Sequence, residues 1–108
     1  TVSLRHMLDH AREAVALAHG RSRSDLDSDR VLCLALVRLA EIVGEAANRV
    51  SADQHARHPR IPWAAMVGLR NRLIHGYDSI NHDVLWQILT TDFPRLIGTL
   101  EAIVNLGK

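Results

Sequence analysis

The segment from about Asp25 to Val50 is the feature that most limits what this chain can fold into. Projected on a helix at about 100° per residue, it separates into two unequal faces. The wide face is apolar and centres on Leu32, Leu36, Leu39, Val43, Ala46 and Val50, whereas the narrow polar face holds Arg38, Glu41, Glu45, Asn48 and Arg49. A helix that is apolar around most of its circumference packs against neighbours on several sides. We therefore predict a helical bundle with this segment at its centre.

Two further helices are indicated on either side of this segment. Apolar residues recur at helical spacing from Ser3, which suits an N-cap, to Gly20, which suits a helix stop. Ser51 with Gln54 three positions later is a capping-box pattern, so a short helical turn begins there and ends before Pro59. Because Thr1 rather than Met opens the chain, we expect a trimmed or partial start, with the first helix beginning upstream.

The second half of the chain repeats the helical pattern. Pro62 suits the first position of a helix that ends near Gly76. A turn follows, and either Ser79 or Asn81 is placed to cap a helix over residues 82–90.

Asp92 and Pro94 mark either a kink in that helix or the start of a last one. No strand pattern, repeat or interdomain linker is evident. We therefore predict an all-α fold, an antiparallel up-and-down bundle of four long helices plus a short extra helix, in a single domain over residues 1–108.

Composition narrows the function only modestly. Hydrophobic residues make up 47% and charged residues 23%, as in ordinary globular domains, and the formal net charge is +1. A nucleic-acid partner would therefore need positive charge that is concentrated locally. The longest apolar run, "VLCLALV", is far shorter than the roughly 20 residues of a membrane span. It contains the lone Cys33, which we interpret as core filler in a protein expected to be cytoplasmic.

The stretch "LRNRLIHGYDSIN" over residues 69–81 concentrates polar side chains in a leucine-rich chain. On a helical wheel for residues 62–76, with Trp63 at zero, Arg70 falls in the middle of an apolar arc of about 160°. Burying a guanidinium without a partner is costly, so Arg70 needs either a carboxylate, with Glu45 or Glu41 as candidates, or a cleft on that face.

His75 projects about 140° from Arg70 and about 40° from Asn71 on the same helix. Arg70 and His75 therefore converge only if the arginine reaches round, the last turn unwinds before Gly76, or a second chain completes the site. The negative end of the helix dipole would favour imidazolium and keep His75 titrating near neutrality. The competing interpretation is that His75 merely caps carbonyls at the helix end.

Together these residues resemble a known signature. Arg70, four residues, His75, Gly76 and Tyr77 match the Arg-x4-His-x-Tyr motif of HepT, the ribonuclease toxin of the HEPN superfamily. The segments "RLAEIVGEAANRVS", "IPWAAMVGLRNRLIHGYDSIN" and "VLWQILTTDFPRLIGTLEAI" also look like that family's segments in order. The resemblance implies a dimer whose two motifs face each other, metal-independent RNA cleavage without a cofactor, and an MntA-type nucleotidyltransferase antitoxin that transfers AMP to Tyr77.

The chemistry suits these residue types. A metal-free ribonuclease must deprotonate a 2′-hydroxyl, protonate the leaving 5′-oxygen and stabilise the phosphorane. We assign the acid and base to His75, phosphate binding to Arg70 and orientation of one of them to Asn71, with Tyr77 beside the phosphate path and Glu45 in support. The alternative is a non-catalytic helical module that docks a nucleotidyltransferase.

Other polar clusters have simpler explanations. His6 and His10 are spaced for a metal but lack a third ligand, so a solvated helix face is the simpler interpretation. The stripe from Arg38 to Arg49 is explained equally well as a solvated face or by Glu45 receiving Arg70. Trp63 and Trp86 are interpreted as core or dimer-interface anchors. A basic stretch is formed by His55, Arg57, His58 and Arg60, and it is either an exposed loop without a specific role or a guide for RNA.

Overall fold

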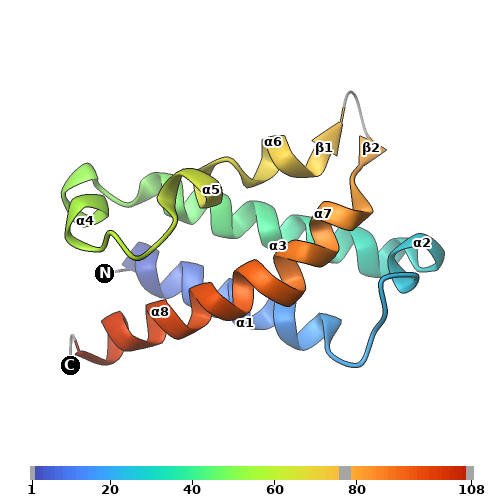
Figure 1. The fold of residues 1–108 in the computed structure, drawn as a ribbon, viewed down its shortest axis with the longest axis horizontal. Helices are drawn as coiled ribbons and strands as arrows, with labels where there is room; N and C mark the ends of the chain where they lie inside the picture. Colours follow the sequence, from blue (N-terminus) through green and yellow to red (C-terminus); the bar gives the residue numbers. More distant parts are fainter. Residues whose placement is uncertain (1, 76–78, 107–108) are drawn as a thin grey trace.

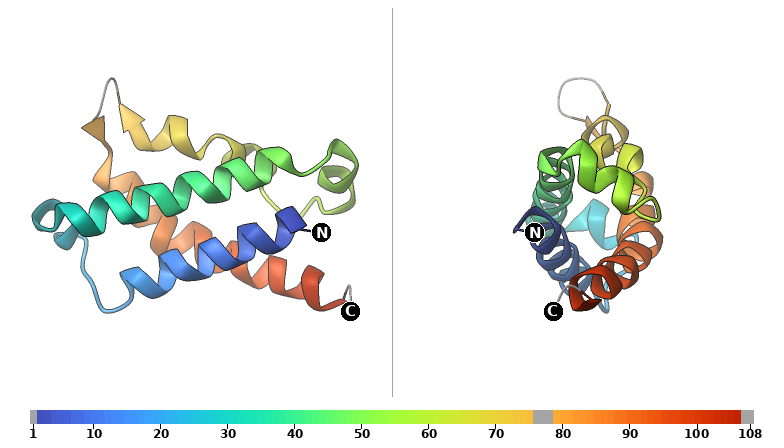
Figure 2. Two further views of the ribbon diagram at one scale, coloured as in Figure 1. Left: turned by 180° about the vertical axis from the view of Figure 1, so that it is seen from behind. Right: turned by 90° about the vertical axis from the view of Figure 1, so that its left-hand side faces the viewer.

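The computed structural model describes residues 2–75 and 79–106 and is built almost entirely of helices. Its elements in chain order are α1 (Val2–Ala18), α2 (Asp25–Ser28), α3 (Arg30–Arg49), α4 (Ala52–Arg57), α5 (Trp63–Val67), α6 (Leu69–Leu73), β1 (Ile74–His75), β2 (Ser79–Ile80), α7 (His82–Gln87), the π-helix η1 (Ile88–Asp92) and α8 (Phe93–Leu106). The rods α1, α3, α5 with α6, and α7 through α8 alternate in direction (Figures 1 and 2). The all-α, up-and-down bundle predicted from the sequence is confirmed.

The central position of α3 is also confirmed. It packs against α1, α2, α5 and α6, and all six residues of its predicted apolar arc are buried. Cys33 is buried among them, as predicted. The predicted start at Asp25 is wrong, because the Asp29 side chain accepts a hydrogen bond from the Leu32 N–H at 3.0 Å and so begins a new helix.

The caps predicted in the first half have mixed outcomes. The Ser51 hydroxyl accepts from the Gln54 N–H, and Gly20 follows α1 at φ +77°, a left-handed conformation that glycine adopts without strain. Ser3 is not an N-cap, because α1 already includes it. Pro62 is the N-cap of α5 rather than its first residue.

The predicted helix from Pro62 to Gly76 is interrupted twice. It breaks at Gly68, which separates α5 from α6, and α6 ends at Leu73. A short antiparallel pair follows, in which Ile74 lies opposite Ile80 and His75 opposite Ser79. The expectation of no strand is therefore wrong, since a pair this short has no alternating pattern that sequence can reveal.

The last part of the chain is one helical rod with a π-helical turn. The Asn81 side chain, rather than that of Ser79, caps α7 by accepting from the Val84 N–H at 3.1 Å. Pro94 lacks an N–H, and in a regular α-helix its ring would crowd the carbonyl of Thr90. Thr90 lies inside η1, so the wider π-helical turn occurs where the proline would otherwise clash. The backbone stays helical from Gln87 to Phe93, so a fresh helix start at Asp92 or Pro94 is not seen, and the irregularity there is a π-helical turn.

Candidate active site

Arg70 lies on the surface of α6, not in the apolar core. Its side chain is 76% exposed, and its Nε lies 3.8 Å from Oε2 of Glu41 on α3. The prediction that Arg70 sits in a buried arc is wrong, because the break at Gly68 ends the helical phase that began at Trp63. Glu41 was one of its two predicted carboxylate partners, and it is the one that pairs within this chain.

Glu45 does not receive Arg70 in the structure. Its carboxylate pairs with Arg38 at 3.3 Å, on the exposed stripe of α3. Glu45 nevertheless lines the same shallow pocket as Glu41 and Arg70, with a volume of about 230 Å³ between α3 and the α5 and α6 segment. The polar stripe of α3 is therefore solvated at Glu45, and it also forms one wall of the Arg70 pocket.

His75 is not at the end of a helix. Its backbone belongs to β1, so the dipole argument for its titration does not hold. The last turn has unwound before Gly76, one of the three conditions under which Arg70 and His75 can converge. The Ile74 N–H donates to the Arg70 carbonyl, so the strand starts directly from the last turn of α6. The His75 side chain and Tyr77 lie outside the described residues.

The residues that flank Arg70 have different surroundings. Asn71 is exposed. Arg72 is half-buried and donates to Asp92 of η1 at 3.1 Å, which ties α6 to the last helical rod. The sequence alone does not reveal the contact between Arg72 and Asp92, because the two residues are 20 positions apart and no local pattern links them.

A polar cluster supports the other side of the hairpin. The Nδ1 of His82, the first residue of α7, lies 2.7 Å from an Asp27 carboxylate oxygen, and its Nε2 lies 3.6 Å from the Sγ of Cys33. Hydrogen bonds from His82 and Arg23 hold the pKa of Asp27 below its ordinary value, while burial raises the pKa of Cys33. A protonated thiol is a poor nucleophile, so we interpret the cluster as a brace that joins α2 and α3 to the start of α7.

The remaining candidates are mostly explained by packing. The Nδ1 of His10 donates to the His6 carbonyl at 2.8 Å, which occupies one of the nitrogens a metal would need. The His55 ring stacks on Trp63 with centroids 4.0 Å apart, and the Trp63 indole donates to the His55 and His58 carbonyls. Trp63 and Trp86 are both half-buried against the core. His55 is therefore structural, whereas Arg57 and Arg60 of the same stretch are exposed.

Comparison with known proteins identifies the class of protein as a small helical ribonuclease. A family model described as Ribonuclease HepT-like matches residues 7–103, so the chain belongs to the HepT-like ribonuclease family. The enzyme class predicted from the sequence, an endoribonuclease, is confirmed. No helix within residues 2–75 and 79–106 offers the apolar length that a bilayer crossing requires.

Individual relatives agree with the family match. The chain is 30% identical over 105 residues to a protein named as a candidate RNase of Caldanaerobacter subterraneus subsp. tengcongensis, covering 97% of this chain and 94% of the relative. It is 34% identical over 100 residues to a protein named as a probable ribonuclease HepT of Thermococcus cleftensis, covering 89% and 91%. A candidate RNase of Methanocaldococcus jannaschii is 31% identical over 97 residues, covering 90% and 89%. No solved structure matched the chain.

Proposed function

We propose that the chain is the toxin of a toxin–antitoxin pair and that it cuts RNA without a metal ion, using Arg70 and His75. The observation that carries this proposal is the state of Arg70. Its guanidinium is exposed and held only loosely, 3.8 Å from the Glu41 carboxylate. A phosphate offers a charge-assisted and bidentate partner in place of that long contact. Glu41 thus positions the arginine while leaving it available to substrate.

His75 supplies the proton transfers in this proposal. It follows α6 by two residues, and β1 leaves the last turn of that helix through the hydrogen bond from Ile74 to the Arg70 carbonyl. The imidazole removes the proton of the 2′-hydroxyl, which attacks the phosphorus, and a protonated imidazole delivers a proton to the departing 5′-oxygen. Arg70 stabilises the charge on the phosphorane, and Asn71 orients one of the two groups.

The proposed site is completed by a second copy of the chain. Exposed apolar side chains accompany the Arg70 pocket. Val67 of α5 lines it and is exposed. Leu34 of α3 is also exposed and lies seven residues, about two turns, before Glu41, which puts both on one side of the helix, and Val31, one turn earlier, is 79% exposed. Apolar residues of this kind at the margin of a polar site are typical of a surface that becomes buried on association. A homodimer across this face would bring two Arg70 and His75 pairs to one cleft.

The activity is tested by RNA cleavage in EDTA. We expect the protein to cut tRNA or messenger RNA under these conditions, and Arg70→Ala to reduce the rate by at least about a hundredfold, because one phosphate-stabilising group is lost. Arg12→Ala is the matched control, since Arg12 is also an exposed arginine paired with a glutamate from another helix. No cleavage by the unmodified protein would favour the docking module instead.

Regulation is proposed to act at Tyr77. A nucleotidyltransferase antitoxin would transfer AMP to its hydroxyl, adding bulk and negative charge where RNA enters. We expect the protein co-expressed with such a partner to gain one or more AMP units in its intact mass, each about 329 Da by formula. Tyr77→Phe should stay unmodified, and an equal mass gain in this variant would refute Tyr77 as the acceptor.

A further inference from the structure

We propose that a basic groove along α8 binds the phosphodiester backbone of RNA and guides the strand toward the cleavage site. This inference rests on the proposed function and adds a substrate-binding surface to it. The groove consists of two adjoining pockets, of about 460 Å³ and about 380 Å³, which share Thr99 of α8. We call the two together the α8 groove.

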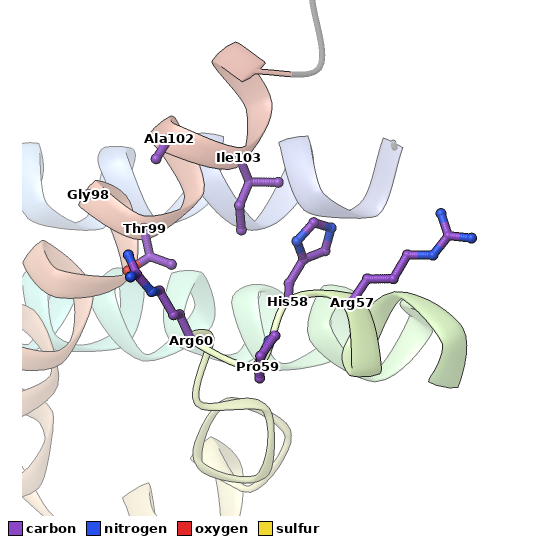
Figure 3. A pocket seen from close by; sticks show the side chains of 8 residues that line it. All are labelled: Arg57, His58, Pro59, Arg60, Gly98, Thr99, Ala102 and Ile103. Carbon is purple, nitrogen blue, oxygen red and sulfur yellow. The ribbon is translucent and has the colours of Figure 1, made fainter.

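The first pocket lies between the loop after α4 and one side of α8. Figure 3 shows the side chains of His58 and Arg60 extending from this loop toward α8, while Arg57 extends away from it. Small and apolar residues of α8, including Gly98, form the opposite wall. This wall leaves room for a strand, and the loop cations face the position that its phosphates would occupy.

The second pocket continues the line of positive charge. Arg95 of α8 and Arg72 of α6 line it. Neither Arg60 nor Arg95 makes an ion pair with any residue that the structure describes. Asp92 is the one acidic residue among those described that line the groove, and Arg72 already neutralises it.

This distribution supplies the local positive charge that a net charge of +1 does not. Of the four arginines that line the α8 groove, Arg57 pairs with Asp53 and Arg72 with Asp92, whereas Arg60 and Arg95 carry charge that no described acid balances. Glu101 of α8 pairs instead with Arg12 of α1. A polyanion binds to such a line by releasing counterions, and it needs no buried apolar surface. The exposed apolar residues Val31 and Leu34, which suit a protein partner, lie on α3 and line neither pocket.

The groove ends at α6, the helix that carries Arg70. Arg72 lines the second pocket on one side of α6, and Arg70 lines its own pocket with Glu41 on another. These residues are separated only by Asn71. A strand that leaves the groove at Arg72 and crosses α6 therefore reaches Arg70, which gives the groove a direct route to the site.

RNA binding by a His75→Ala background tests the groove separately from cleavage. The probe is a fluorescein-labelled single-stranded RNA of about 12 nucleotides, followed by anisotropy between 50 and 200 mM salt. Adding Arg60→Ala and Arg95→Ala together should weaken binding about tenfold and reduce the salt slope by about 1.4, for two lost phosphate contacts. Arg30→Ala is the control, an exposed arginine at the start of α3 that makes no ion pair with an acidic residue in the described part of the chain.

Each outcome decides one question. Weaker binding specific to Arg60 and Arg95 supports the groove, even if the unmodified protein fails to cleave RNA and the proposed activity falls. Equal binding by the double variant, the same loss in Arg30→Ala, or no RNA binding at all overturns the groove. Binding of a polyglutamate peptide, but not of RNA, through Arg60 and Arg95 would also overturn it and would assign the surface to an acidic protein partner.

Discussion

His75→Ala should reduce RNA cleavage by about a thousandfold, the largest effect expected of any single substitution in this chain. The imidazole is the group proposed to move both protons, so its removal affects the attack of the 2′-hydroxyl and the departure of the 5′-oxygen alike. The measurement is the single-turnover rate on tRNA in EDTA, with binding of the same RNA recorded separately. We expect RNA binding to change little, because phosphate binding is proposed to rest on Arg70 and the α8 groove rather than on His75.

The control for this variant is Ser79→Ala. Ser79 lies opposite His75 in the hairpin and is exposed, so its substitution perturbs the same short strand pair without removing the imidazole. We expect it to retain nearly full activity. Equal losses in both variants would show that the integrity of the hairpin, and not the imidazole, controls the rate, and would remove His75 from the proposed chemistry.

Mixing two inactive variants tests whether one site draws residues from two chains. If Arg70 of one chain works with His75 of its partner, a heterodimer of Arg70→Ala and His75→Ala contains one intact site. Random pairing then restores about a quarter of the unmodified activity, since half of the dimers are mixed and each has one working site of two. No recovery from an authentic mixed dimer would place Arg70 and His75 in the same chain's site.

Gly44→Ala should lower the free energy of unfolding by about 1–3 kcal/mol, because it overpacks a close contact between α3 and α5. A Cβ at this position would lie 2.9 Å from the Met66 carbonyl oxygen and 3.7 Å from the Cβ of Leu69. The backbone of α5 must therefore move away from α3. Urea unfolding at equal protein concentration measures the effect, since a dimer's stability depends on concentration.

The matched control is Gly98→Ala on α8. A Cβ there meets no heavy atom within 4 Å, so only helix propensity changes and the protein should gain up to about 1 kcal/mol. The opposite signs separate packing from propensity. If Gly44→Ala were as stable as the unmodified protein, the contact between α3 and α5 would not need glycine. A shift of α5 would also displace Val67 and the wall of the Arg70 pocket.

Some features of the fold could be predicted because they depend on neighbours in the chain. The apolar arc of α3 depends on residues three and four positions apart, and the prediction that this arc is buried is confirmed. The caps at Ser51 and Asn81 involve the N–H groups of residues three positions later, and both were among those predicted. Helix start and stop signals of this kind act over less than one turn, so the sequence displays them directly.

The end of the motif helix could not be predicted in the same way. Gly68 costs only about 1 kcal/mol relative to alanine in a helix interior, so its presence does not by itself indicate a break. The hairpin after α6 pairs only Ile74 with Ile80 and His75 with Ser79. As a result the helical wheel assigned Arg70 to the core, while the structure exposes it.

The sequence by itself determined the all-α class, the central helix and the Arg70 to Tyr77 motif that resembles HepT, because helical periodicity and motif spacing are local. Only the tertiary structure decided that Arg70 pairs with Glu41 while Glu45 pairs with Arg38. It also decided that the α8 groove runs from the loop after α4 to Arg72. The Arg70 to Glu41 contact and the groove both join helices that are far apart in the chain, and such contacts leave no periodic signal along the sequence.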